Sequence, residues 1–320
     1  IAATGKLYHH WEDNQAQWGD VYHNVRGGFE PGGYVTEEGR RIRREEGKGY
    51  KGLSWESGDA PDDAYPDGAR AAWAVGKLEE YAKNPDERPF FLGVGFTKPH
   101  LPFVAPRKYF DLYPPESIGL SPIPVPGDGI SRYNLYGAGE ITGYVDIPDQ
   151  LGPGHPPLSP DKARELRRGY YGCVSFIDAQ LGRILDALDE TGLSENTVVV
   201  LWGDHGFMLG DQGTWCKKTV LRFALEVPMV IAAPQGAKGA RTDALAELAD
   251  LYPTLSELLG LPLPEHLEGR SLAPVLRDPS ASVRDHVYAV WPAGAKNPDR
   301  TIIGQTVFDG RYRYTEWRHQ

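Results

Sequence analysis

The stretch "TVVVLWGDHGFMLGDQGTWCKK", from Thr197 to Lys218, opens with an apolar run and then changes to charged and small residues. A continuous apolar run is typical of a central strand that is covered on both faces. Function gathers at the carboxyl ends of strands in open α/β sheets, and Asp204 and His205 follow this run directly. The pair is suited to binding a cation, with Gly206 letting the backbone turn away closely. An aspartate that caps the next turn beside an ordinary loop histidine fits the pattern equally well.

A long helix is predicted directly before this strand, over residues 159–192. Ser159 followed by Pro160 is typical of a capped helix start, and Gly192 is a natural stop. Apolar side chains recur between them at steps of three and four, so one stripe of the helix faces a core. Both ends of this helix are therefore well defined by the sequence.

Further helices and apolar runs extend the same arrangement. Residues 67–84, "DGARAAWAVGKLEEYAKN", predict a helix with Asp67 as its N-cap, and the apolar run "RPFFLGVGF" over residues 88–96 follows as a buried strand. Residues 227–234, "VPMVIAAP", predict another central strand. Helices that alternate with buried strands predict an α/β fold with a central, mostly parallel sheet flanked by helices.

The character of the chain changes after residue 262. The pieces "DHVYAVW", "TIIGQTVFDG" and "RYRYTEW" are rich in β-forming residues and have no helix between them. We therefore predict an α/β domain over residues 1–262 and a small C-terminal antiparallel β subdomain over residues 263–320.

Composition narrows the class of protein. The 34 Lys and Arg residues against 44 Asp and Glu give a net charge of −10, which argues against a general nucleic-acid partner. No apolar run approaches the roughly 20 residues that cross a bilayer, so no membrane span is expected. An anionic substrate would then need a local cationic pocket.

Lysines and histidines gather in three places that could form such a pocket. In "FTKPHLPF" two prolines stiffen the backbone and hold Lys98 and His100 in fixed directions. In "TGKLYHH" Lys6 and His9 are spaced to bind a tetrahedral anion, and Lys217 adds charge after Asp204. Taken singly, these segments could be a proline-rich loop, a frayed terminus and a solvated charge pair. Together they predict a pocket for a charged tetrahedral ester held by a cation.

The segments "GKLYHH", "FTKPHLPFVAPRKYFDLYP", "GYYGCVSFIDAQLGRILDALDETGL", "TVVVLWGDHGFMLGDQGTWCKK" and "VPMVIAAP" occur in this order along the chain. In this order they closely resemble the sulfatases of the alkaline phosphatase superfamily, and within them most closely the iduronate-2-sulfatases. The resemblance spans nearly the whole chain and implies an alkaline-phosphatase-like α/β domain with a small antiparallel C-terminal subdomain. It also implies hydrolysis of a sulfate ester on a sugar, with a 2-O-sulfated uronic acid as the expected substrate.

The resemblance implies roles for particular residues. Asp204 corresponds to a ligand of an active-site Ca²⁺, and His205 lies beside that ion as a ligand or as a partner of the nucleophile. His100 is the expected acid that protonates the leaving alcohol, and His9 is expected to help break down the sulfated intermediate. The positions that match the family's sulfate contacts are Lys6, His9, His100 and Lys217, and Lys98 accompanies them.

One departure from the family is marked. The family's nucleophile is a formylglycine made from a Cys in C-x-P-S-R, and neither that motif nor S-x-P-S-R occurs in these 320 residues. The resemblance therefore implies an interior portion of a longer enzyme that is inactive alone and associates with its own N-terminal portion. A phosphate or phosphonate ester hydrolase of the same superfamily, and a non-catalytic protein that binds sulfated glycans, stay open as alternatives.

The expected location is also inherited from the family. Relatives that degrade glycans imply an exported, periplasmic or extracellular protein that meets a sulfated saccharide. The sequence has no Asn-X-Ser/Thr sequon, which makes a lysosomal location less expected.

Overall fold

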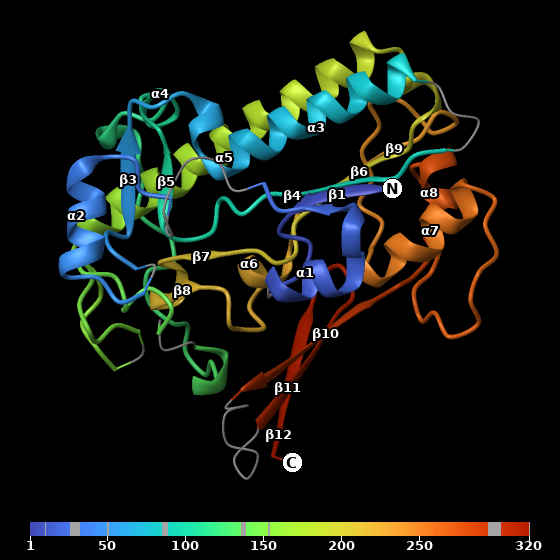
Figure 1. Cartoon of the computed structure of the whole chain (residues 1–320). Coiled ribbons are helices and arrows are strands. Elements are labelled where there is room, and N and C mark those ends of the chain that lie inside the picture. Colours follow the sequence, from blue (N-terminus) through green and yellow to red (C-terminus); the bar gives the residue numbers. More distant parts are fainter. Residues whose placement is uncertain are drawn as a thin grey trace. The chain divides into compact units, whose positions relative to one another are not determined.

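The computed structural model of the chain describes residues 1–9, 11–25, 33–49, 51–84, 89–135, 139–152, 154–293 and 302–319 (Figure 1). It divides into two compact units. The first unit contains residues 1–126, 137–194 and 209–215, and the second contains residues 127–136, 195–208 and 216–320. In the described part of the chain, no helix is both long enough and apolar enough to cross a membrane.

The first unit contains a parallel sheet built around the first residues of the chain. Its strands run in the order β2-β1-β4, and β1 pairs in parallel with both neighbours. Every residue of β1 is buried, with Ala3 fully inaccessible. A second parallel pair is formed by β3 and β5. The bounds of these strands are β1 Ala2–Gly5, β2 Tyr22–His23, β3 Trp55–Gly58, β4 Leu92–Gly95 and β5 Phe103–Pro106.

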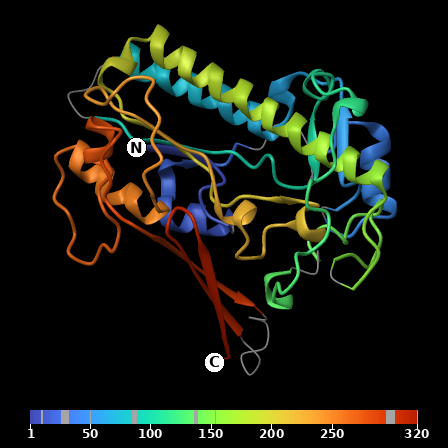
Figure 2. The same cartoon turned by 180° about the vertical axis from the view of Figure 1, so that it is seen from behind.

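Two long helices of the first unit, α3 (Pro66–Lys83) and α5 (Pro160–Glu190), lie side by side, as both views show (Figures 1 and 2). The predicted ends of α5 are confirmed: the Ser159 hydroxyl accepts a hydrogen bond from the amide of Lys162, and Gly192 follows with a φ of 72°. The other helices of this unit are α1 (Trp11–Trp18), α2 (Glu37–Glu45) and α4 (Arg107–Phe110).

Helix α5 packs closely against its neighbours because glycines lie on its buried face. A Cβ atom at Gly169 would lie 3.0 Å from the side chain of Phe103, and one at Gly172 would lie 3.0 Å from the ring of Phe110. The aromatic side chains of β5 and α4 therefore rest directly on the helix backbone. This packing supports the predicted helix layer over a sheet.

In the second unit β6 (Val199–Trp202) pairs with β9 (Met229–Ala232) in antiparallel orientation. Trp202 is 49% exposed and Val230 is 56% exposed, so the expected cover on both faces of these strands is not found in the described structure. The short strands β7 (Met208–Leu209) and β8 (Trp215–Cys216), each with one residue in the first unit and one in the second, pair with each other. The helices described in the second unit are α6 (Arg222–Leu225), α7 (Leu251–Leu258) and α8 (Ala273–Arg277).

The C-terminal strands form the predicted antiparallel sheet, in the order β10-β11-β12. Gly304 in β11 faces the indole of Trp317 across the sheet, and that indole donates a hydrogen bond of 2.7 Å to the side-chain oxygen of Asn134. The aromatic ring thus covers the position that lacks a side chain. The bounds of the strands are β10 Val287–Ala293, β11 Ile302–Phe308 and β12 Arg313–His319.

Two glycines allow β1 and β4 to approach closely where both strands end. Gly5 has a φ of 79°, and a Cβ atom there would clash with the carbonyl of Gly95. A Cβ atom on Gly95 would in turn clash with the backbone of Lys6. The amide of Lys6 donates to the Gly95 carbonyl across 2.8 Å, so this close approach fixes where the chain leaves the sheet.

We expect Gly95→Ala to destabilise the protein by about 2 kcal/mol, because the added methyl group must displace backbone atoms. Urea unfolding followed by circular dichroism measures the change. The control is Gly76→Ala in α3, where a Cβ atom meets nothing within 4 Å, and it should stabilise the protein by up to about 1 kcal/mol. Equal stabilities of the two variants would contradict this account of the strand ends.

Candidate functional site

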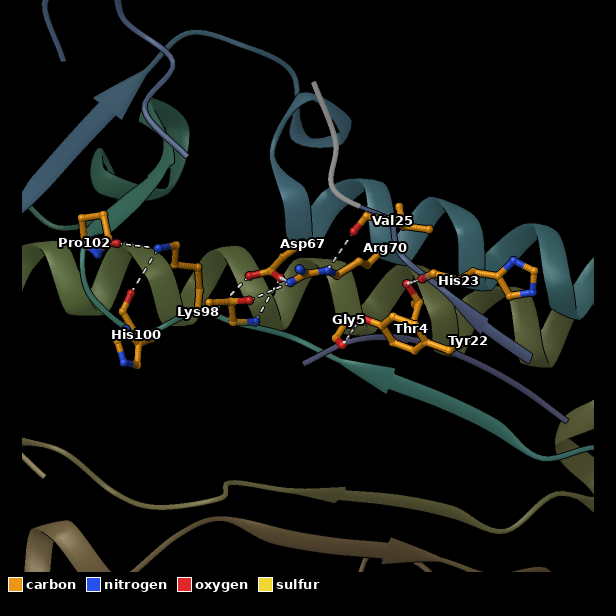
Figure 3. A network of polar contacts seen from close by, with 11 residues as sticks. Thr4, Gly5, Tyr22, His23, Val25, Asp67, Arg70, Lys98, His100 and Pro102 are labelled. Carbon is orange, nitrogen blue, oxygen red and sulfur yellow. Dashed lines mark hydrogen bonds and ion pairs between the residues drawn. The ribbon is translucent and has the colours of Figure 1, made fainter. Parts of the chain in front are cut away.

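The ends of β1 and β4 bring two predicted site segments to the same edge of the sheet. The strands are parallel and Gly5 pairs with Gly95, so Lys6 and residues 97–100 leave the sheet side by side. The hydroxyl of Tyr22 donates to the Gly5 carbonyl across 2.9 Å and holds the end of β1 (Figure 3). The alternative interpretation of this segment as a frayed terminus is wrong, because the residues before Lys6 form the buried central strand of the sheet.

A buried carboxylate holds the segment that follows β4 (Figure 3). One oxygen of Asp67 accepts from the amide of Thr97 across 3.0 Å, and the other accepts from the amide of Lys98 across 2.9 Å. The predicted N-cap role of Asp67 is wrong: α3 begins at Pro66, and no side chain caps its N-terminus. Asp67 lies inside the first turn and bonds to two amides of a distant loop instead.

Arg70 completes this arrangement from the next turn of α3. Its guanidinium lies 2.5 Å from the Asp67 carboxylate and 2.7 Å from the hydroxyl of Thr97, and it also donates to the carbonyl of Val25 across 3.2 Å. Asp67 is 2% exposed, so a charged partner and two amides compensate for its desolvation. We call these two residues the Asp67–Arg70 clamp.

The ammonium group of Lys98 bonds to the loop that carries it. It donates to the carbonyl of His100 across 3.1 Å and to the carbonyl of Pro102 across 2.5 Å (Figure 3). Desolvation lowers the pKa of Lys98. In this arrangement Lys98 stabilises the turn that presents His100, and a direct contact with substrate stays a prediction.

The imidazole of His100 is directed away from the Lys98 ammonium (Figure 3). Its Nδ1 lies 2.6 Å from the carbonyl oxygen of Leu101, and its Nε2 lies 2.9 Å from a carboxylate oxygen of Glu140. The side chain is 22% exposed, so it is accessible while both ring nitrogens have partners. His9 lies in the bend after β1 and is exposed.

Asp204 and His205 follow β6 in the second unit. The amide of Gly203 donates to the Pro228 carbonyl across 3.1 Å, and the amide of Gly206 donates to the Ala224 carbonyl across 2.9 Å, which fixes both ends of the turn. The Asp204 side chain is 62% exposed and accepts from the amide of His205 across 3.1 Å.

The orientation of His205 follows from its neighbours. Its Nδ1 lies 2.8 Å from the Gly206 carbonyl oxygen, and its Nε2 lies 3.7 Å from the Asp204 carboxylate. Ca²⁺ takes six to eight oxygen ligands in proteins. Within the described ranges, no three His, Cys, Asp or Glu side chains come together in a way that could hold a metal ion. The role of Asp204 and His205 in binding Ca²⁺ therefore stays a prediction.

Lys217 is also in the second unit, between β8 and α6. It follows Cys216, which is fully buried. The backbone of Cys216 has a φ of 71°, in the left-handed region that residues other than glycine rarely adopt. The amide of Thr219 donates to the Lys217 carbonyl across 2.8 Å and tightens the following turn. A buried side chain and a tight turn thus fix the backbone on both sides of this lysine.

The predicted site residues therefore fall into two groups. Lys6, His9, Lys98 and His100 lie in the first unit, and Asp204, His205 and Lys217 lie in the second. Sequence reasoning missed the contacts of Asp67 and Glu140. Asp67 resembles an ordinary helix cap in sequence, and Glu140 lies in a Gly-rich and Pro-rich stretch where no periodicity relates it to His100.

A parallel α/β sheet with lysine and histidine side chains beyond its strand ends is typical of enzymes whose sites lie at the carboxyl edge of the sheet. A family model described as "Sulfatase" matches residues 7–261, and one described as "N-sulphoglucosamine sulphohydrolase, C-terminal" matches residues 210–314. The chain belongs to the sulfatase family.

Individual relatives agree with this membership. The chain is 32% identical to a sulfatase of Formosa agariphila over 93% of its own length and 58% of that protein, and 28% identical to the iduronate 2-sulfatase of Mus musculus over 98% and 67%. The chain thus spans about 60% of the length of these relatives. The solved phosphonate monoester hydrolase from Silicibacter pomeroyi shares the fold, with a TM-score of 0.60 and 22% identity over 94% of this chain and 65% of that one.

We expect Asp67→Asn to lower the free energy of unfolding by about 1–3 kcal/mol, because an amide offers one oxygen where two backbone amides and Arg70 need acceptors. Chemical denaturation measures the loss. Asp178→Asn on the exposed face of α5 is the matched control and should change little. A loss no larger than that of the control would contradict the clamp.

Cys173 should not react with a thiol reagent at pH 8 in the folded protein, because burial raises the pKa of its thiol to about 12. Peptide mass spectrometry after alkylation distinguishes Cys173 from Cys216. Alkylation in urea is the control, and both cysteines should then be modified. Rapid modification of Cys173 without denaturant would contradict its burial in the core.

Proposed function

We propose that this chain forms part of a sulfatase that hydrolyses the sulfate ester of a sugar, with a 2-O-sulfated uronic acid as substrate. Membership of the sulfatase family supports the reaction type. The likeness to an iduronate 2-sulfatase over 98% of the chain supports the sugar. The observation that carries the proposal is the parallel pairing of β1 with β4, which places Lys6 and the segment of Lys98 and His100 at one edge of the sheet.

The chemistry of an ester sulfate suits these side chains. Ammonium groups neutralise the charge on sulfate oxygens, and we assign this role to Lys6 and Lys217. A sugar alcohol is a poor leaving group and needs a proton as its bond to sulfur breaks, which we assign to His100. His9 is assigned to the later step that frees the enzyme from sulfate.

Two groups of the proposed reaction are not supplied by the described residues. Asp204 and His205 would contribute to holding Ca²⁺, with further carboxylates from outside the described set. When bound, the ion would neutralise charge on the sulfate and a formylglycine would supply the attacking oxygen. Because the 320 residues contain no C-x-P-S-R, we propose that a further polypeptide segment contributes the nucleophile and associates with this chain.

We further propose an exported location, because sulfated saccharides of this kind are met outside the cell. A phosphate or phosphonate ester is the second candidate substrate class, and it is tested in the same experiment.

The test uses the protein expressed from its complete gene, with released sulfate or phosphate measured by ion chromatography. We expect release from a disaccharide with a 2-O-sulfated uronic acid, and little from a 6-O-sulfated glucosamine or a phosphonate monoester. His100→Ala should lower kcat by about 10²- to 10⁴-fold, the usual contribution of a general acid. Lys217→Ala should lower kcat by about 10- to 10³-fold through lost charge stabilisation.

The matched control is Lys83→Ala, at an exposed lysine near the end of α3, and it should keep activity within about twofold. Phosphonate hydrolysis without sulfate release would favour the second substrate class. Full sulfatase activity in both His100→Ala and Lys217→Ala would refute the assigned site.

A further inference from the structure

Glu140 contacts the proposed acid from a distant part of the sequence. One of its carboxylate oxygens lies 2.9 Å from Nε2 of His100, and its side chain is 11% exposed. The two residues are 40 positions apart, and Glu140 belongs to no helix or strand. The contact is therefore made by the fold of the loops and not by local geometry.

The two contacts of the His100 ring determine its protons. The carbonyl of Leu101 only accepts hydrogen bonds, so Nδ1, 2.6 Å away, carries a proton. A carboxylate also only accepts, so Glu140 is placed to accept a hydrogen bond from a proton on Nε2. The contact thus favours a proton on the ring nitrogen that is not bonded to the backbone.

Further hydrogen bonds fix the backbone of both Glu140 and His100. The ammonium of Lys51 donates to the backbone carbonyl of Glu140 across 2.7 Å and lies 5.3 Å from the centre of the Tyr144 ring. The His100 carbonyl accepts from the Lys98 ammonium, and the His100 amide donates to the Thr97 carbonyl across 3.0 Å. These contacts fix the backbone of both residues, and the Leu101 carbonyl and the Glu140 carboxylate contact the two ring nitrogens.

We propose that Glu140 is the positioning residue of His100, and that it holds the proton which His100 delivers to the leaving sugar oxygen; this rests on the proposed function. As the bond between sulfur and the sugar oxygen breaks, its electron pair stays on that oxygen. The oxygen takes the proton from Nε2, and the sulfuryl group passes to the oxygen nucleophile. Before the transfer, the Glu140 carboxylate compensates the positive charge of the imidazolium. When substrate binds, the leaving sugar oxygen replaces the carboxylate as the hydrogen-bond partner of Nε2.

The dependence of kcat on the leaving group tests this role. A nitrophenolate can leave without being protonated, whereas a sugar alkoxide needs a proton to leave. In the protein expressed from its complete gene, Glu140→Gln should lower kcat on the sugar sulfate by about 10- to 100-fold, a part of the 10²- to 10⁴-fold of a general acid. KM should stay within about threefold, and kcat on 4-nitrophenyl sulfate should change less than threefold. Glu140→Asp should recover part of the loss, and Glu79→Gln, at an exposed glutamate of α3, should behave as the unaltered protein.

A second measurement does not depend on activity. Nitrogen-15 NMR of the imidazole rings should show the signal of His100 Nε2 at a different chemical shift in Glu140→Gln than in the unaltered protein, because an amide replaces the carboxylate that contacts this nitrogen. Equal losses of kcat on both esters, or a His100 Nε2 signal that is the same in both proteins, would overturn the proposal. If the unaltered protein hydrolyses neither sulfate ester, the proposed function itself fails, and the role of Glu140 fails with it.

Discussion

Asp67 accepts hydrogen bonds from two consecutive amides of the segment after β4 while its carboxylate lies almost wholly inside the protein. Amides that leave the end of a strand have lost their partners in the sheet and must find others. Asp67 provides both acceptors, and Arg70 compensates its charge and extends the contact to Thr97 and Val25. The direction of the loop that carries Lys98 and His100 therefore depends on this clamp.

The sheet adds a second constraint at the same place. Gly5 and Gly95 allow the two backbones to touch where the strands end, and the amide of Lys6 then bonds to Gly95. Lys6 after β1 and the segment of His100 after the neighbouring strand β4 are thereby brought to one edge of the sheet. The backbone of the first unit thus brings two of the segments that carry the proposed site to the same edge of the sheet.

Local patterns in the sequence predicted much of this architecture. The ends of α5, the α/β class and the antiparallel C-terminal strands follow from caps, apolar periodicity and the loss of helical segments. The central position of β1 did not follow, because four small residues carry little periodicity.

The contacts that shape the candidate site were less predictable. The bonds of Asp67 span about thirty residues and those of Glu140 span forty, and a single sequence holds no signal for such pairs. The apolar runs of β6 and β9 led to the opposite error. They predicted strands covered on both faces, but Trp202 and Val230 are exposed. The proposed roles of Lys6, His100, Asp204 and Lys217 rest on their motifs and on the resemblance to sulfatases.

The amine of Lys98 has an effect on the protein's response to alkali. Its pKa in the folded chain is lowered by desolvation, whereas the unfolded chain keeps the ordinary value. Between these two values the unfolded state binds more protons, so this group makes folding more favourable as pH rises. A neutral amine still has hydrogens for the carbonyls of His100 and Pro102. Loss of the Lys98 proton at alkaline pH therefore removes the cost of burying a charge, while the hydrogen bonds that hold the turn before His100 can still form.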